Sequence, residues 1–424
     1  MHATERRRAA VQRIWSAAVA AASPSEVVAA AVRLQPDGGV LVGEIALPDR
    51  PIWAIAIGKA ASSMEAGLRD AVGARLVESI VVGKGPDTAI VAQQVPTRHY
   101  LRGSHPVPDQ RSLDAGAAVL AFAEAIPAGD AVVCLISGGG SALVEVLRDG
   151  IDLAELQGVT RDLLASGATI QEMNAVRGRL SQIKAGGLRQ ALAHTHAVSL
   201  VISDVLGNDP ASIASGLTAE PSSLRAEDVL ARYGVACVLP DASVKRHDVD
   251  HEMVIVADVT TAIDAAAVAA QAEGHAPWVL LPDLDGEARF VGSLLGGIVR
   301  AAALDDASDP RCFIAGGETT VTIRNTPDGP GGRNCEAALA AALRIAGADV
   351  TLAFLATDGD DGTTGAAGAI VDGTTVPAQL RRRAEAALSA HEAYGFLRER
   401  GALWSPGISG TNVNDLVIGL TGRV

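Results

Sequence analysis

The stretch Leu135-Ile136-Ser137-Gly138-Gly139-Gly140-Ser141-Ala142-Leu143 decides the fold. It continues the apolar, β-branched run 131–136 and leads into residues 143–147, which have helical character. Where a strand ends in glycines and a helix follows directly, backbone N–H groups are left unpaired. Glycines let a ligand approach the backbone, and the flanking serine hydroxyls add hydrogen bonds. We therefore expect residues 137–141 to hold a phosphate or a carboxylate, the alternative being a tight turn without a ligand.

Strand-like and helix-like segments alternate on both sides of this stretch. The expected strands are 52–57, 78–82, 131–136 and 197–202, and the expected helices are 59–72 and 183–193. This alternation predicts an α/β protein with a parallel sheet that is covered on both faces. Before it, residues 1–31 predict two short amphipathic helices, of which the second begins at Pro24.

The length of 424 residues favours two domains over a single core. Residues 221–251 are more charged than their surroundings, so we place the domain boundary near residue 245. Beyond it, the expected elements are strands at 253–257, 278–281 and 350–356, helices at 260–272 and 334–345, and a hairpin at 311–324.

Composition excludes some classes of function. The formal net charge is −14, and a nucleic-acid partner would require a basic footprint. No apolar run reaches membrane-spanning length, so we expect no membrane segment. The four cysteines show no metal-ligand spacing, which is typical of reduced thiols in a cytoplasmic protein.

Several polar residues follow the expected strands, where open α/β sheets bind ligands. Lys59 comes just after the first strand, at a helix start whose dipole disfavours a cation. This position suits a lysine that meets an anion, although a single exposed lysine is also tolerated at small cost. Asp204 follows the strand that ends at residue 202 and is a candidate to orient a hydroxyl or to hold Mg²⁺. Asn208 and Asp209 suit either that role or a turn.

The C-terminal half carries similar loops. Arg333 follows a glycine-rich segment and opposes the dipole of the next helix, so we expect it to face an anion. The acidic run 357–362 indicates a metal site or a solvated turn. His105 in the turn-like segment 104–109 is expected to be a structural hydrogen-bonding group.

Some familiar motifs are missing from the sequence. It contains no P-loop, no G-x-G-x-x-G dinucleotide motif and no G-x-S-x-G nucleophile elbow. A site assembled from several loops with cations, acids and hydroxyls suits phosphoryl transfer, which depends mainly on positioning and charge stabilisation.

Ten segments, in this order, resemble the glycerate 2-kinase family, whose C-terminal part is known as the MOFRL domain. They are AIGKA (56–60), SHPVPD (104–109), SGGGSAL (137–143), SGATIQEMNAVRGRLSQIKAGGL (166–188), SDVLGNDPASIASG (203–216), GEAR (286–289), GGETTVTI (316–323), GPGGRN (329–334), ATDGDDG (356–362) and GTNVNDL (410–416).

The resemblance implies a kinase that uses ATP and Mg²⁺ to phosphorylate the 2-hydroxyl of D-glycerate, giving 2-phosphoglycerate. It implies a Rossmann-like, parallel-sheet N-terminal domain over residues 1–245 and a smaller α/β, MOFRL-type domain over 246–424, with the active site in the cleft between them. We expect glycerate and ATP as partners, and a monomer or a homodimer.

The resemblance also implies roles for individual residues. The expected catalytic residues are Lys59, Asp204 and Arg333. The expected substrate- or nucleotide-binding residues are Ser137, Gly138, Gly139, Gly140, Ser141, Asn174, Glu318, Asn334 and Asn412. Asp358 and Glu318 are the candidate Mg²⁺ contacts.

The chain departs from the usual family pattern at several positions, namely Gly178, Arg179, Asn208, Leu217, Cys335 and Gly365. Asn208 and Gly365 each stand where the family usually has an aspartate, which removes negative charge and puts metal binding or substrate preference in doubt. The alternatives are a kinase for another sugar acid such as a tetronate, a hydroxypyruvate reductase, or a non-catalytic relative that binds a sugar acid.

Overall fold

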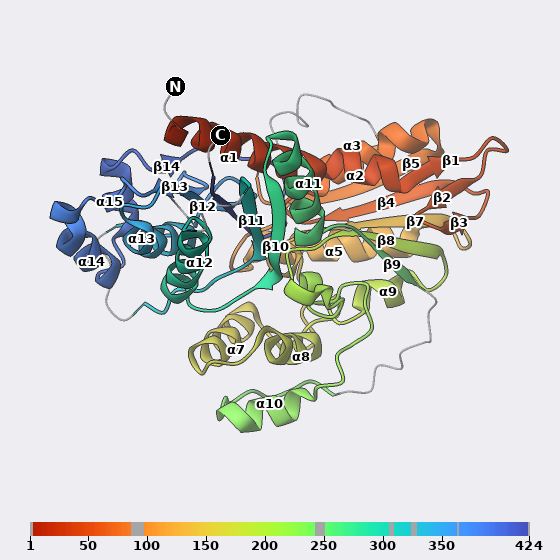
Figure 1. Ribbon diagram of the computed structural model, residues 1–424. Coiled ribbons are helices and arrows are strands. Elements are labelled where there is room, and N and C mark those ends of the chain that lie inside the picture. Colours follow the sequence, from red (N-terminus) through yellow and green to blue (C-terminus); the bar gives the residue numbers. More distant parts are fainter. Residues whose placement is uncertain are drawn as a thin grey trace. The chain divides into compact units, whose positions relative to one another are not determined.

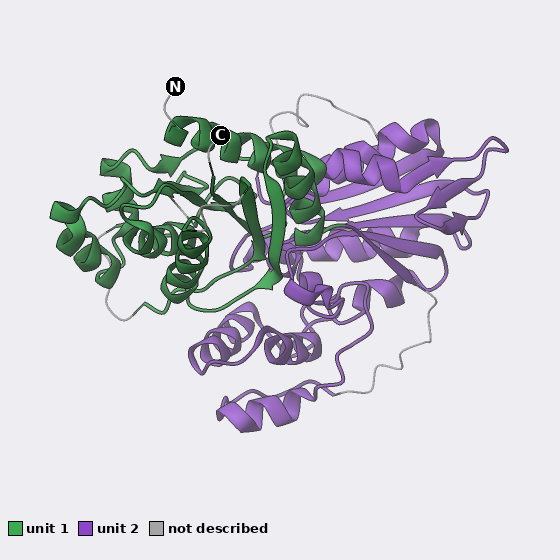
Figure 2. Ribbon diagram, in the orientation of Figure 1, with its two compact units in different colours: residues 1–23, 257–424 green, residues 24–256 purple. Residues whose placement is uncertain are grey.

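The computed structural model of the chain (Figure 1) describes residues 3–85, 97–241, 251–304, 309–323, 329–362 and 364–422. The chain divides into two compact units, coloured separately in Figure 2. Unit 2 comprises residues 24–256, and unit 1 comprises residues 1–23 together with 257–424. The N-terminal helix therefore belongs with the C-terminal residues, whereas the sequence led us to expect it in the N-terminal domain. The expected boundary near residue 245 lies outside the described residues.

Unit 2 is built on a six-stranded sheet with the order β6-β5-β4-β7-β8-β9. Its strands are β4 (Ile52–Ile57), β5 (Leu76–Gly83), β6 (Arg98–Arg102), β7 (Ala131–Ile136), β8 (His196–Ile202) and β9 (Glu252–Ala257). All pairings from β6 to β8 are parallel, which confirms the predicted Rossmann-like sheet. Every residue of β7 is buried, as expected for a central parallel strand that is apolar on both faces.

Helices cover both faces of this sheet, with α2 and α3 on one face and α5 on the other (Figure 1). The helices of unit 2 are α2 (Pro24–Ala31), α3 (Ala61–Val72), α5 (Gln110–Ala125), α6 (Gly140–Leu143), α7 (Leu153–Ala165), α8 (Ile170–Leu180), α9 (Gly187–Ala191) and α10 (Ala226–Tyr233). A small antiparallel sheet contains β1 (Val32–Leu34), β2 (Val40–Val42) and β3 (Ile45–Leu47). Helices α7, α8 and α10 share a separate small core that includes Leu156, Val176 and Leu230.

Unit 1 contains a mixed six-stranded sheet with the order β10-β11-β15-β12-β13-β14. Its strands are β10 (Ala276–Leu284), β11 (Arg311–Gly317), β12 (Thr351–Ala356), β13 (Gly368–Asp372), β14 (Leu403–Trp404) and β15 (Asp415–Leu420). Only the β10–β11 pairing is parallel among these described strands. The helices are α1 (Ala3–Ala21), α11 (Val259–Ala272), α12 (Ala288–Ala302), α13 (Arg333–Ile345), α14 (Arg381–Ser389) and α15 (Ala393–Glu399).

The alanine-rich helix α13 forms the centre of the core of unit 1. It packs with α12 and with one face of the sheet, where Phe354 is 1% exposed. Gly292 of α12 lies so close to this helix that a Cβ there would come within 2.0 Å of the Ala337 carbonyl oxygen. Among the described residues, no single helix is long and apolar enough to cross a membrane; α1 and α2 reach that length and composition only as a pair bent by 45°.

Three local expectations were wrong. Residues 311–324 do not form a hairpin within the described residues, because β11 is already paired on both sides, with β10 and β15. Residues 144–147 are not helical, because the chain there bonds to other segments: Glu145 N–H donates to Ser112 O, and Gln182 N–H donates to Val146 O. Helix α6 is thus a single turn, and the expected helix 183–193 is reduced to the five residues of α9.

Candidate active site

The carboxyl ends of β4, β7 and β8 meet at one edge of the parallel sheet in unit 2. Ile57 is in register with Ile136, and Ile136 with Val201, so the loops that follow these strands start side by side. This arrangement brings together three of the sequence-predicted groups: Lys59, the loop of residues 137–141 (hereafter the glycine loop) and Asp204.

The glycine loop is held against the end of β4 by close backbone contacts. Lys59 N–H donates to Gly138 O at 2.9 Å, and Ala60 N–H donates to Ser137 Oγ at 3.1 Å. A Cβ at Gly58 would lie 2.1 Å from Ser137 Oγ, and Gly58 has a φ of +136°. Only glycine fits there without strain, so the sequence Ile57-Gly58-Lys59 is what allows the two loops to meet.

The glycine loop retains hydrogen-bonding capacity. In the part of the chain that the structure describes, the N–H groups of Gly138 and Gly139 have no hydrogen-bond acceptor. Helix α6 has only four residues, so its dipole contributes little. The capacity of the loop to hold an anion therefore rests on individual N–H groups and on the hydroxyl of Ser141.

Asp204 and Lys59 lie against successive glycines of this loop. A Cβ at Gly138 would be 2.0 Å from Asp204 Oδ2, and a Cβ at Gly139 would be 3.3 Å from Lys59 Cγ. Neighbouring Cα atoms are about 3.8 Å apart. The Asp204 carboxylate and the aliphatic part of Lys59 thus lie next to neighbouring residues of the glycine loop.

His105 joins the Lys59 side of the loop. Its Cδ2 would lie 3.1 Å from a Cβ at Gly139. Burial, followed by the positive charges of Lys59 and Lys84, lowers the pKa of His105 to about 4. The imidazole is therefore neutral at neutral pH, and the positive charge at this point comes from the two lysines. Sequence reasoning missed Lys84, although it follows β5 just as Lys59 follows β4.

Asn174 reaches the glycine loop through a residue that the sequence analysis missed. Ser215 Oγ lies 2.9 Å from Asn174 Oδ1 and 2.7 Å from Ser141 Oγ, so the three side chains form one hydrogen-bonded row. Ala214 and Ser215 have φ values of +48° and +57°, which are uncommon for residues other than glycine. Gly140 accommodates this turn, since a Cβ there would be 2.8 Å from the Ala214 side chain.

The residues after Asp204 form a turn. Asp209 Oδ1 accepts from Ala211 N–H at 3.2 Å, and Oδ2 accepts from the Ser212 hydroxyl at 2.6 Å. Asn208 has a φ of +54°, a conformation that asparagine tolerates well. For Asp209, the structure thus supports the turn rather than the metal alternative.

Two of the departures from the family pattern lie nearby on α8. Arg179 forms an ion pair with Glu227 and donates to Pro240 O at 2.8 Å. A Cβ at Gly178 would be 2.6 Å from the Ala185 side chain, so this position contacts the turn that precedes α9. Both residues therefore have structural partners within unit 2.

Unit 1 has its own polar cluster at the edge where β11 and β12 end and β15 begins. Asp415 is in register with Gly317 of β11 and with Ala356 of β12. Arg333 donates from Nε to Asp415 Oδ2 at 2.6 Å, from Nη2 to Asp415 Oδ1 at 3.0 Å, and from Nη1 to Glu318 Oε1 at 2.6 Å. Burial opposes the charge of Arg333, but these carboxylates outweigh it and raise its pKa above the ordinary value. The anions that Arg333 faces include two carboxylates of the protein itself.

Asp361 lies at the start of α13 and was not singled out from the sequence. Its carboxylate accepts from Asn334 N–H at 3.1 Å and from Cys335 N–H at 2.8 Å. Burial, with a smaller contribution from the charge of Asp415, raises the pKa of Asp361 to about 6. The side-chain nitrogen of Asn334 is buried and has no acceptor among the described residues.

The metal contacts expected at Asp358 and Glu318 do not form a dedicated metal site. Glu318 accepts from Arg333 and, through Oε2, from Asn414 Nδ2 at 3.2 Å. Asp358 Oδ1 accepts from Asp360 N–H at 3.0 Å, as in a solvated turn. Across the described ranges, no group of three or more His, Cys, Asp or Glu side chains could hold a metal ion. The expected binding residue Asn412 lies in the same region, two residues before Asn414.

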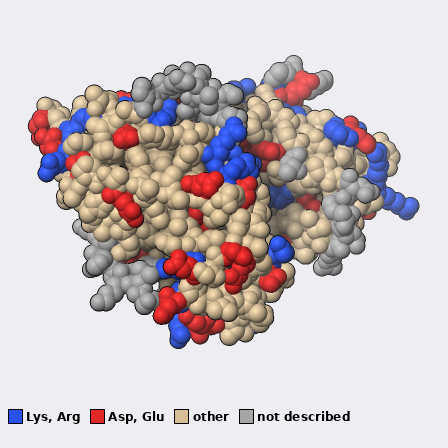
Figure 3. Space-filling model, turned by 180° about the vertical axis from the view of Figure 1, so that it is seen from behind, with Lys and Arg blue, Asp and Glu red and all other residues tan. Residues whose placement is uncertain are grey.

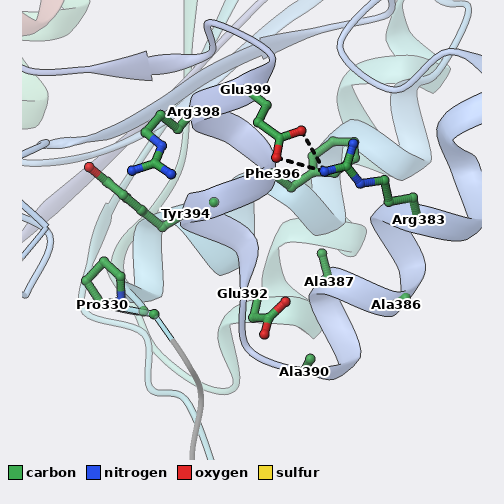
Figure 4. A pocket seen from close by; sticks show the side chains of 13 residues that line it. Pro330, Arg383, Ala386, Ala387, Ala390, Glu392, Tyr394, Phe396, Arg398 and Glu399 are labelled. Atoms are coloured by element: carbon green, nitrogen blue, oxygen red, sulfur yellow. Dashed lines mark hydrogen bonds and ion pairs between the residues drawn. The ribbon is translucent and has the colours of Figure 1, made fainter.

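A pocket of about 580 Å³ lies elsewhere in unit 1, between α14, α15 and residues 329–331 (Figure 4). Its charged groups are largely satisfied within the protein. Arg383 pairs with Glu399 at 2.6 Å, and the Arg398 guanidinium lies 5.7 Å from the centre of the Tyr394 ring. None of the residues predicted from the sequence to form the active site lines this pocket.

Surface charge adds a broader constraint. On the face drawn in Figure 3, Lys and Arg side chains lie among Asp and Glu side chains, without a wide area of positive charge among the described residues. Such a mixed surface does not provide the basic footprint of a nucleic-acid-binding protein on this face.

A parallel sheet with polar loops at its carboxyl edge defines an α/β protein of the class that binds small ligands there. Comparison with known proteins narrows this class. The model of a domain of unknown function, DUF4147, matches residues 10–247, and that of the MOFRL family matches residues 311–415. A D-glycerate 2-kinase from Thermotoga maritima is 37% identical to this chain, over 86% of this chain and 89% of the relative. The chain belongs to the glycerate 2-kinase family.

Other relatives extend the match along the chain. A glycerate 2-kinase from Pyrococcus horikoshii is 33% identical, with 96% of each chain covered. A protein from Agrobacterium vitis whose name describes a hydroxypyruvate reductase is 37% identical over 96% of this chain and 93% of its own length. The crystal structure of a glycerate kinase from Thermotoga maritima has a TM-score of 0.86 and 32% identity, covering 99% of this chain and 100% of that one.

Proposed function

We propose that this chain is an ATP-dependent D-glycerate 2-kinase that produces 2-phosphoglycerate. The names of its relatives support glycerate as the acceptor, and their similarity extends over almost the whole chain. The observation that carries the proposal is the placement of Asp204 and Lys59 against Gly138 and Gly139, because phosphoryl transfer depends on positioning and charge stabilisation, and these residues supply a proton acceptor and a cation side by side.

In this proposal Asp204 accepts a hydrogen bond from the 2-hydroxyl of D-glycerate. The hydroxyl oxygen forms a bond to the γ-phosphorus of ATP while the bond from that phosphorus to the bridging oxygen breaks. The hydroxyl proton passes to the Asp204 carboxylate, and ADP leaves with the bridging oxygen. Lys59 stabilises the negative charge on the transferred group, and Gly139 N–H adds a donor.

The imidazole of His105 lies beside Gly139 and is neutral at neutral pH, so in this proposal the positive charge at the phosphoryl group comes from Lys59. Arg333 has donated three of its five N–H groups to Asp415 and Glu318. Its remaining donors can serve an anion, and its role as an anion clamp is part of the proposal.

Mg²⁺ enters the proposal as the counter-ion of the ATP phosphates. Magnesium usually binds through substrate phosphates and one or two carboxylates, so a dedicated protein cage is not required. The protein residues expected to contact it, Glu318 and Asp358, already have hydrogen-bond partners, and we assign them no step.

A cytoplasmic location belongs to the same proposal. All four cysteines are free, and burial raises the pKa of Cys134 to about 12 and that of Cys312 to about 12. Such thiols are unreactive and suit a reducing compartment.

The test is an assay for ADP release with Mg-ATP and D-glycerate, with tetronates as competing acceptors. NMR of the product locates the phosphorylated carbon. We expect phosphate on carbon 2, a nearly complete loss of turnover in Lys59→Ala, and partial activity in Lys59→Arg because the charge is kept. Wild-type turnover in Lys59→Ala, or NADH oxidation with hydroxypyruvate in place of ADP release, would overturn the proposal.

A further inference from the structure

A pocket of about 450 Å³ within unit 2 adjoins the glycine loop. Gly139 and Ser141 line one end of it, and His105 lies beside them. The segment 105–108 and helices α7 and α8 form its walls. Gln157 of α7 fixes the segment by donating to Pro108 O at 2.8 Å, so this wall is braced.

The rim of this pocket is apolar and exposed. Val107 is 54% exposed, Leu164 is 65% exposed and Ile170 is 42% exposed, and all three line the pocket. They come from three separate elements: the segment 105–108, α7 and α8. Large apolar side chains that gather in this way at a concave site indicate a ligand with an apolar part.

The pocket is also lined by cations, of which Lys184 is buried, Arg177 is half-buried and Arg161 is exposed. Lys184 forms an ion pair with Glu145, and both side chains are almost completely buried. Arg177 and Arg161 line the same pocket. Three cations against one carboxylate leave the lining positive in a chain whose net charge is −14. A local excess of this kind favours a polyanionic ligand.

The size argues against glycerate as the occupant. A three-carbon acid needs neither 450 Å³ nor an apolar rim. An apolar rim, cationic side chains in the lining and the Gly139 N–H, which has no acceptor among the described residues, together match a nucleoside polyphosphate. We infer that this pocket binds the nucleoside part of the phosphoryl donor, with the base at Val107, Leu164 and Ile170 and the phosphates directed toward Gly139. The inference rests on the proposed kinase function and adds the location of its nucleotide.

With the nucleotide in this pocket, the two substrates bind at different residues of the glycine loop. The nucleotide approaches Gly139, where Lys59 and His105 lie. The acceptor lies on the side of Gly138, where the Asp204 carboxylate is positioned. The phosphoryl group then moves from the nucleotide at Gly139 to the acceptor hydroxyl at Gly138, which is the neighbouring residue of the loop.

Binding without turnover tests this inference. The probe is AMP-PNP with Mg²⁺, a non-hydrolysable ATP analogue, measured by isothermal titration calorimetry. The variant is Leu164→Glu, which places a negative charge on the exposed rim. We expect the Kd for AMP-PNP to rise at least about tenfold, and the KM for ATP to rise more than the KM for D-glycerate. The matched control is Val268→Glu on α11, where the replaced side chain is 68% exposed, and we expect no change in either constant.

A second measurement does not depend on a substitution. Irradiation with 8-azido-ATP should label peptides from residues 105–108 or 156–170 of the wild-type protein. Unchanged AMP-PNP affinity in Leu164→Glu, labelling only elsewhere, or a selective rise in the KM for D-glycerate would each overturn the inference. These results differ from a failure of the proposed function, in which the wild-type protein neither binds AMP-PNP nor releases ADP.

Discussion

Replacing Gly138 by alanine is expected to reduce kcat by about a hundredfold while leaving the fold intact. The added Cβ would lie 2.0 Å from Asp204 Oδ2, whereas real Cβ atoms almost never come closer than 3.0 Å to another heavy atom. The Asp204 carboxylate must therefore withdraw by at least about 1 Å. A displacement of about 1 Å in a catalytic group can reduce the rate about 10²-fold, which corresponds to about 2.7 kcal/mol in the activation free energy.

The stability of this variant should change little. Gly138 does not have the positive φ that would make alanine strained, and Asp204 is partly exposed and can move toward solvent. Alanine also lowers the conformational entropy of the unfolded chain, an effect of about 0.4–1 kcal/mol. We expect the free energy of unfolding, measured with urea, to stay within about 1 kcal/mol of that of the wild type.

The assay is steady-state ADP release with saturating Mg-ATP and D-glycerate. In an Asp204→Ala background, Gly138→Ala should reduce kcat by no more than a further threefold or so, because the displaced group is already gone. Gly158→Ala is the matched control, since a Cβ there meets nothing within 4 Å. Wild-type kcat in Gly138→Ala, or equal hundredfold losses in both backgrounds, would refute a role of Asp204 in the reaction.

Three further predictions concern stability and charge. Lys59→Ala should raise the pKa of His105 from about 4, but not to the ordinary 6.5, because burial is the larger cause of the shift. NMR titration of the imidazole measures this pKa, and an unchanged value would contradict the proximity of Lys59 and His105. Gly58→Ala would place a Cβ 2.6 Å from Ser137 O at a φ of +136°, so the free energy of unfolding should fall by more than about 2 kcal/mol, and full stability in denaturant would exclude this close packing. The pKa of Asp361 is about 6 in the folded protein against 3.8 as its ordinary value, so the folded state binds this proton more tightly. The contribution of Asp361 to the free energy of unfolding is present below pH 4 and is lost as the pH rises through 6, by up to about 3 kcal/mol. In urea unfolding at different pH values, Asp361→Asn should remove this part of the pH dependence. Identical pH profiles for the variant and the wild type would contradict the prediction.

The central strands of unit 2 could be predicted because their environment is uniform. A strand buried on both faces needs an apolar residue at every position, and β4 and β7 show this as short, continuous apolar runs. The strand ends then located Lys59 and the glycine loop, because ligand loops follow the carboxyl ends of parallel strands. The hairpin predicted at residues 311–324 was wrong because a strand's own sequence does not specify its partners, and β11 pairs with β10 and the distant β15.

The residues missed in the site share a different property. Ser215 carries no signal that separates it from an ordinary turn residue, and only the structure shows its hydrogen bond to Ser141. Lys84 follows β5 just as Lys59 follows β4, but only the structure shows that its charge acts on His105. Asp361 lies within a motif that we noticed, yet its raised pKa depends on burial and on the neighbouring carboxylate of Asp415. Such effects require distances, which sequence spacing does not provide for segments far apart in the chain.

The sequence by itself determined the α/β class, the parallel sheet of unit 2 and the glycine loop, because these depend on local patterns of apolar residues and glycines. Only the tertiary structure decided that Asp204 lies against Gly138 and that Arg333 is held by Asp415 and Glu318. The physical reason is that hydrogen bonds and charge interactions act over a few ångströms, and the register of neighbouring strands sets which distant residues come within that range.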